Sequence, residues 1–120
     1  MKNYVTAIIV AAGNSSRMKL QMSKQFIPLL GEPAIKYTLS AFERSYLIDS
    51  IVVVCRPQDV IALRSIIAKN EITKVREVVY GGATRGESVF NGIKASAEET
   101  THFAIHDGAR PLIELEDIER

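Results

Sequence analysis

Four runs of apolar residues recur along the chain, separated by amphipathic or turn-forming sequence. The first two runs are rich in Ile and Val, which is typical of strands buried on both faces of a sheet, and the fourth is short. The third run alternates in part between apolar and polar residues, so we expect it nearer an edge of the sheet. The four predicted strands are Val5–Ala12, Ile51–Cys55, Val75–Tyr80 and Phe103–His106.

The segments between these strands have helical periodicity. Apolar residues recur on one helical face after Pro33, after Pro57 and from about Gly86. The three predicted apolar stripes are Ile35, Leu39, Phe42 and Tyr46; Val60, Leu63 and Ile67; and Val89, Ile93 and Ala97. Strands that alternate with helices predict parallel pairing with right-handed crossovers, and therefore an open, mainly parallel α/β sheet.

The composition indicates one soluble globular domain over residues 1–120. The chain is 47% hydrophobic and 24% charged with a net charge of +1, so no overall basic field indicates a nucleic-acid partner. A single cysteine, Cys55, excludes an intramolecular disulfide and fits a reducing compartment. No apolar run approaches the roughly 20 residues that a membrane helix needs. We therefore expect a cytoplasmic protein with neither a nucleic-acid nor a membrane partner.

The charges are unevenly distributed along the chain. No Asp or Glu precedes Glu32, whereas Lys2, Arg17, Lys19 and Lys24 all do. These cations are either a chance cluster of solvated side chains or part of a polyanion-binding loop. In open α/β sheets, ligands bind outside the carboxyl ends of the strands, near the switch in strand order. The segments that follow the predicted strands are 11–26, 55–58, 80–88 and 106–111.

The loop after the first strand has the residue types of a phosphate-binding turn, although it is neither a G-x-G-x-x-G fingerprint nor a P-loop. The small residues Ala11, Ala12 and Gly13 leave room for phosphate oxygens to approach backbone N–H groups. Arg17 supplies a planar fork for bidentate contact, and Lys24 supplies a compact positive charge. A plain turn with solvated cations is the alternative.

The segment HDGARP, residues 106–111, places a carboxylate directly after the fourth predicted strand. Mg²⁺ takes one or two carboxylates together with substrate phosphates, so Asp107 is a candidate metal ligand. The alternative is that Asp107 only holds the turn through a hydrogen bond of its side chain. We interpret His106 as a structural residue and not as a catalytic base.

The segment GGATRGES, residues 81–88, follows the third predicted strand. Its two glycines permit close backbone approach, and Arg85 and Ser88 lie where a helix begins and N–H groups point outward. A plain turn with Ser88 as an N-cap is the alternative. We assign Cys55 and Tyr80 to packing.

Taken together, these segments resemble the 2-C-methyl-D-erythritol 4-phosphate cytidylyltransferases of isoprenoid biosynthesis. The matching pieces are AAGNSSRM, SKQFIPLLGEPAIKYTLSAF, GGATRGESVFNGI and HDGARP, in the family's order and spacing. They cover nearly the whole chain. The ribitol 5-phosphate cytidylyltransferases are similar over the same pieces, so the acceptor stays open.

The resemblance implies a three-layer, Rossmann-like nucleotidyltransferase fold that uses CTP, a polyol phosphate and Mg²⁺ and releases pyrophosphate. It also implies a homodimer at full length. Arg17 and Lys24 look like the catalytic pair that stabilises the transition state, and Asp107 looks like the metal ligand. The CTP-binding positions that the resemblance implies are Ala11, Ala12, Gly13, Gly82, Arg85, Ser88, Asp107 and Arg110.

The chain departs from the family pattern at three positions, with Ser15 for glycine, Ser23 for proline and Gly108 for alanine. No charge is lost at Ser15 or Ser23, so the assignment stands. The family's acceptor-binding residues lie beyond the equivalent of residue 120, and we therefore expect this chain to correspond to the amino-terminal half of the enzyme. A CTP-binding chain without turnover is a third interpretation, and we expect weak CTP binding, self-association and no measurable transfer from residues 1–120.

Overall fold

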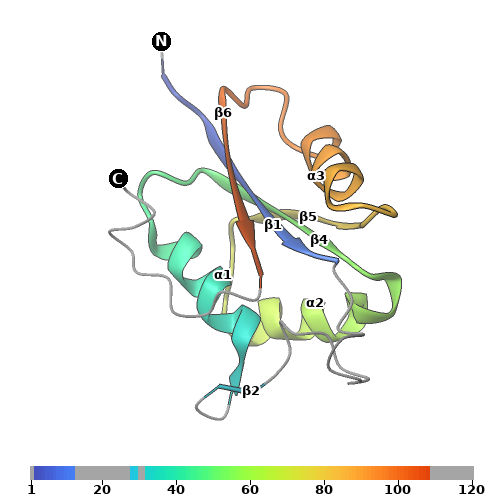
Figure 1. Ribbon diagram of the computed structural model, residues 1–120. Helices are drawn as coiled ribbons and strands as arrows, with labels where there is room; N and C mark the ends of the chain where they lie inside the picture. The colour runs from blue at the N-terminus through green and yellow to red at the C-terminus, as the bar shows by residue number, and fades with distance from the viewer. Residues whose placement is uncertain (1, 13–27, 30–31, 109–120) are drawn as a thin grey trace.

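The computed structural model describes residues 2–12, 28–29 and 32–108, and its centre is a parallel sheet (Figure 1). Every neighbouring pair of strands in this sheet is parallel. The order across the sheet is β5–β4–β1–β6, which is 3-2-1-4 when the four strands are counted along the chain. The strands are β1 (Val5–Ala11), β4 (Ser50–Cys55), β5 (Val75–Tyr80) and β6 (His102–Asp107). The prediction of an open parallel α/β sheet is confirmed.

Helical segments connect these strands as the periodicity predicts. They are α1 (Ala34–Arg44), the short 3₁₀ helix η3 (Pro57–Asp59), α2 (Val60–Lys69) and α3 (Arg85–Lys94). Two short strands, β2 (Pro28–Leu29) and β3 (Glu32–Pro33), pair antiparallel in a separate ribbon that the sequence analysis did not predict. In the described part of the chain, no helix combines the length and the apolar character needed to cross a bilayer.

The helices cover both faces of the sheet, which gives three layers (Figure 1). Successive side chains of a strand point to opposite faces, so Ile9 faces α1 and α2 while Ile8 faces α3. The larger core cluster joins alternate residues of β1 and β4 to Ile35 and Leu39 of α1 and Leu63 of α2. β1 and β4 are therefore buried on both faces, as their continuous apolar runs predict.

The helix α3 packs closely on β1 and β4 at a glycine, Gly92. A β-carbon on Gly92 would come within 2.7 Å of Ile8 Cγ2 and 3.1 Å of Val54 Cγ2. Gly92 itself is buried. The close packing fixes the position of the amino-terminal end of α3, which carries several of the predicted site residues.

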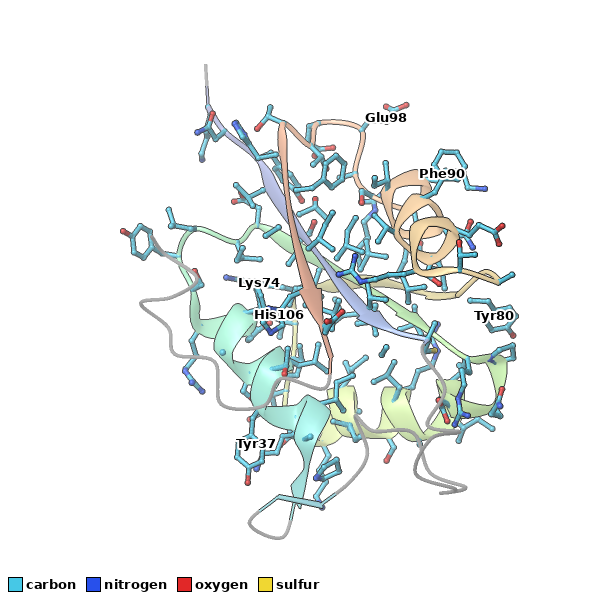
Figure 2. All side chains as sticks on the ribbon, in the orientation of Figure 1. Tyr37, Lys74, Tyr80, Phe90, Glu98 and His106 are labelled. Atoms are coloured by element: carbon cyan, nitrogen blue, oxygen red, sulfur yellow. The ribbon has the colours of Figure 1, made fainter. Side chains whose placement is uncertain are left out.

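Three side chains assigned to the interior lie outside it, and one of them is Ile93 on the predicted stripe of α3, which is 38% exposed. The helix α1 ends at Arg44 and Ser45 is extended, so Tyr46 has left the helical face and is 79% exposed. Tyr80 ends the edge strand β5 and is 58% exposed, and Figure 2 shows its side chain directed outward. The prediction that Tyr80 serves packing is therefore wrong. The partial alternation of β5 correctly predicted its place at an edge of the described sheet.

Candidate functional site

The strand order reverses at β1, and this reversal defines the position of the candidate site. The chain moves outward from β1 through β4 to β5, and β6 then returns to the other side of β1. The helices change faces in step, since α1 and α2 lie on one face and α3 on the other. In open α/β sheets, this switch point at the carboxyl ends of the strands is where ligands bind. The residues at this end are Ala11, Ala12, Gly81, Asp107 and Gly108.

The turn after β5 packs directly against the end of β1. A β-carbon on Gly81 would lie 2.3 Å from Ala12 Cβ and 2.8 Å from Ser88 Oγ, so no larger residue fits without movement. The Gly81 N–H also donates to the Cys55 carbonyl oxygen at 3.0 Å. The small side chains at the end of β1 are therefore matched to the glycine turn.

Ser88 supports this turn from within α3. Its side chain is almost fully buried, and its Oγ accepts a hydrogen bond from the Gly82 N–H at 3.1 Å. α3 begins at Arg85, and its N-cap is Thr84. The alternative that Ser88 is an N-cap is therefore wrong, and its hydroxyl instead holds the backbone of the predicted CTP-binding segment in place.

The first turn of α3 is closed by two hydrogen bonds of Thr84 and Glu87 that the sequence analysis missed. Thr84 Oγ1 accepts from the Glu87 N–H at 3.1 Å, and Glu87 Oε1 accepts from the Ala83 N–H at 2.7 Å. The T-x-x-E spacing before an apolar stripe is the signal for a capping box. Here the Thr84 half of the box is formed, while Glu87 accepts from Ala83, the residue before the N-cap. These bonds set the direction in which α3 leaves the turn.

Asp107 and Arg85 meet across the crevice. Asp107 is the last residue of β6 and lies beside Val10 in the register with β1. The distance from Arg85 Nη2 to Asp107 Oδ1 is 3.3 Å, and both side chains are partly open to solvent. The structure thus joins two residues that the sequence placed in separate candidate segments.

The neighbour of Asp107 in β6 points to the other face of the sheet. The His106 ring packs against Phe42 of α1 with 5.4 Å between ring centroids. Figure 2 shows His106 beside α1. Because strand side chains alternate between faces, Asp107 then lies on the α3 side, where it reaches Arg85. The packing of His106 supports its interpretation as a structural residue.

The residues at the carboxyl end of β4 support the fold and do not form part of the candidate site. Cys55 is fully buried, and burial, followed by the nearby Asp59 carboxylate, raises the pKa of its thiol to about 11. The thiol therefore stays protonated near neutral pH, which agrees with a packing role. Arg56 makes a bidentate ion pair with Asp59, at 2.8 Å from Nε and 3.0 Å from Nη2. This ion pair stabilises the first turn of η3. The segment after β4 therefore forms the start of a helical segment.

Several predicted site residues lie outside the described residues. These are Gly13, Arg17, Lys24 and Arg110, and their roles stay predictions. Within the described ranges, no group of three or more His, Cys, Asp or Glu side chains is arranged to hold a metal ion. A metal at this crevice would thus take few protein ligands from the described part of the chain.

The sequence matches one family model, that of 2-C-methyl-D-erythritol 4-phosphate cytidylyltransferase, over residues 5–120. The chain belongs to this family. It is 43% identical over 114 residues to the family's enzyme from Clostridium acetobutylicum, an alignment that covers 94% of this chain and 49% of that protein. The chain thus spans about half the length of the curated relatives it matches.

Solved structures agree with the family assignment. The 4-diphosphocytidyl-2C-methyl-D-erythritol synthase from Anaerococcus prevotii superposes with a TM-score of 0.85 at 31% identity, covering 98% of this chain and 48% of that one. Rv0371c from Mycobacterium tuberculosis, in a complex with manganese, has a TM-score of 0.73 at 20% identity, covering 98% of this chain and 57% of that one. The second likeness shows a shared fold.

Proposed function

We propose that residues 1–120 provide the CTP-binding part of an enzyme that transfers a cytidylyl group from CTP to 2-C-methyl-D-erythritol 4-phosphate. The observation that carries this proposal is the family match over residues 5–120. In the proposed reaction, an oxygen of the acceptor's phosphate attacks the α-phosphorus of CTP. The bond from that phosphorus to the bridging oxygen breaks, and pyrophosphate leaves. The product would enter isoprenoid biosynthesis by the non-mevalonate route.

The end of β1 is proposed to receive the phosphates. Ala11 is nearly fully buried and Ala12 is partly buried at the switch point. Small side chains here let phosphate oxygens come close to backbone N–H groups. Gly13 continues this turn in the sequence, and we propose that it takes part in the same cradle. The contact of Ala12 with Gly81 supports this, since it brings the two predicted nucleotide-binding turns together.

Arg17 and Lys24 are proposed to carry the catalytic charge. Attack at the α-phosphate spreads negative charge over its oxygens, and fixed cations offset that charge in the transition state. Arg17 offers a planar fork for two phosphate oxygens, whereas Lys24 offers one compact charge. Both roles rest on the matching sequence segments.

The turn of residues 81–88 is proposed to recognise cytosine. Its backbone is held in advance by the hydrogen bond from Gly82 to Ser88 and by the hydrogen bonds that Thr84 and Glu87 accept. A preorganised turn can present backbone groups to one edge of a base with little ordering cost on binding. Arg85 adds a positive charge at the start of α3.

Asp107 is proposed as the protein ligand of Mg²⁺, with Arg110 beside it on the nucleotide. The residues fit such an ion, because Asp107 is a partly exposed carboxylate at the crevice and Mg²⁺ needs only one or two carboxylates in addition to phosphates. When bound, the ion would neutralise charge on the phosphates of CTP. The manganese complex of Rv0371c shows that a protein with this fold has been observed with a divalent cation.

A transfer assay with the protein as its gene encodes it tests the proposal. The protein is incubated with CTP labelled at the α-phosphate, MgCl₂ and either 2-C-methyl-D-erythritol 4-phosphate or ribitol 5-phosphate. We expect a labelled product and pyrophosphate with the first acceptor. If product forms only with ribitol 5-phosphate, then ribitol 5-phosphate is the acceptor and the proposed acceptor is wrong. If CTP binds but neither acceptor gives product, the protein binds CTP without turnover.

The oligomeric state is a further part of the proposal. We propose that the full-length enzyme is a homodimer, as the family resemblance implies. Light scattering coupled to gel filtration measures the mass in solution directly. A mass of twice the chain mass supports the dimer, and a monomer across the micromolar range contradicts it.

A further inference from the structure

The ion pair between Arg85 and Asp107 joins two sides of the crevice that belong to different elements. Arg85 is the first residue of α3, and Asp107 is the last residue of β6. The two atoms are 3.3 Å apart, while the side chains are 59% and 41% exposed. An ion pair this open to water stabilises a fold by little and is broken readily. The pair is therefore suited to exchange with another cation.

A divalent cation at Asp107 would compete with this guanidinium. Oδ1 of Asp107 is the atom that Arg85 contacts, and a metal ion binds carboxylates through the same oxygen atoms. A metal on this carboxylate must displace Arg85 or lie beside a like charge, which is unfavourable. Since no larger acidic cluster exists among the described residues, the state of this single carboxylate would dominate binding of the metal alone.

We propose that Arg85 is a placeholder cation for the metal ion, an inference that rests on the function proposed above. The guanidinium neutralises Asp107 before the nucleotide and metal bind. A divalent cation then takes the carboxylate, and Arg85 is released at the amino-terminal end of α3, beside the glycine turn. There its charge attracts the anionic nucleotide, so metal binding at β6 is coupled to nucleotide binding at α3.

This exchange gives Arg85 opposite effects on two binding steps. It opposes binding of the metal alone, because it occupies the carboxylate and repels a second cation. It favours binding of the metal–nucleotide complex, because the released guanidinium adds a positive charge at the start of α3, beside the proposed nucleotide site. A residue that only supported the local fold would weaken both steps when replaced.

Titration of Mn²⁺ into the nucleotide-free chain, followed by electron paramagnetic resonance of free Mn²⁺, tests the first effect. Arg85→Gln should bind Mn²⁺ about two- to fivefold more tightly than the unaltered chain, which is the range expected for removing an exposed ion pair and one repelling charge. Arg76→Gln is the matched control, because Arg76 is an exposed arginine on β5 and its loss changes the net charge equally. It should leave the Mn²⁺ affinity unchanged. Unchanged or weaker Mn²⁺ binding by Arg85→Gln would overturn the proposal.

Calorimetry with CTP at saturating Mn²⁺ tests the second effect. Arg85→Gln should bind CTP several-fold more weakly than the unaltered chain, in the direction opposite to its effect on Mn²⁺ alone. Equal CTP affinity of the two proteins would contradict the claim that the released Arg85 guanidinium favours nucleotide binding. If CTP fails to bind the unaltered chain, the proposed function is wrong, while the Mn²⁺ titration still decides the placeholder role by itself.

Discussion

Gly81 lies against Ala12 so closely that its missing β-carbon would come within 2.3 Å of the alanine β-carbon. The two residues directly follow different strands, Ala12 after β1 and Gly81 after β5. Their contact spans β4, whose last carbonyl group, that of Cys55, accepts from the Gly81 N–H. The geometry of the predicted nucleotide site therefore requires glycine at position 81.

Gly81→Ala should destabilise the fold and weaken CTP binding. The added methyl group would meet Ala12 Cβ and Ser88 Oγ, and overpacking of this kind costs about 1–3 kcal/mol. Urea unfolding and CTP calorimetry measure the two effects. Gly86→Ala is the matched control, because the nearest atom to its added carbon is 3.8 Å away. That control should keep or slightly raise the stability, since alanine is a better helix former. Equal behaviour of both variants would refute the role of this contact.

Removing the cap of α3 should destabilise the chain. Thr84→Ala deletes the oxygen that accepts from the Glu87 N–H, and such a loss typically costs about 1 kcal/mol. The free energy of unfolding in urea measures it. Ser65→Ala, at an exposed position of α2, should change this free energy by far less. A Thr84→Ala variant as stable as the unaltered chain would show that the cap contributes nothing.

Much of the fold could be predicted because burial leaves a direct trace in the sequence. The continuous Ile and Val runs of β1 and β4 predicted strands buried on both faces, and the partial alternation of β5 predicted an edge. Helix ends were harder, because Tyr46 fits the apolar stripe of α1 by spacing while the helix stops at Arg44. Periodicity records which positions share a face and not where the helix ends.

The sequence predicted which segments form the candidate site, but it did not predict which of their side chains contact each other. Strand ends and glycine turns identified Asp107 and the 81–88 segment, which the parallel sheet does bring to one edge. The ion pair of Asp107 with Arg85 depends on how α3 crosses the sheet, and that crossing is set by Gly92 against Ile8. Such a long-range contact leaves no local pattern. The cap at Thr84 was, by contrast, readable from the T-x-x-E spacing.

The stability contributed by Glu43 should depend on pH. Burial raises the pKa of this carboxyl, but hydrogen bonds from the Thr73 hydroxyl and the Lys74 N–H, together with the Lys74 charge, outweigh burial and lower it from 4.5. A folded pKa below the unfolded one means that the stabilisation is present above about pH 4.5 and is lost as the pH falls through the folded pKa. Glu43→Gln should therefore be less stable than the unaltered chain at pH 7, and the difference should shrink below pH 4.5. Unfolding curves at several pH values test this, with Glu77→Gln on β5 as the control; a constant difference would contradict it.

Lys24→Ala should lower turnover of the encoded enzyme much more than its CTP affinity. Losing one transition-state donor costs about 3–4 kcal/mol, or roughly 10²–10³-fold in rate. Arg17→Lys should also be damaging, because an ammonium group cannot reproduce the bidentate fork. Steady-state kinetics with 2-C-methyl-D-erythritol 4-phosphate separates kcat from KM. An unchanged kcat for Lys24→Ala would remove this residue from catalysis.

The most direct test of the account is calorimetry of CTP and UTP binding to residues 1–120 in the presence of MgCl₂. If the 81–88 turn recognises cytosine at the switch point, CTP binds measurably, and UTP binds at least about tenfold more weakly, because the wrong base leaves polar groups of the turn unpaired. Asp107→Asn should remove most of the dependence of CTP binding on Mg²⁺. Equal affinities for CTP and UTP, or no binding of CTP, would contradict the assignment of this crevice as a CTP site.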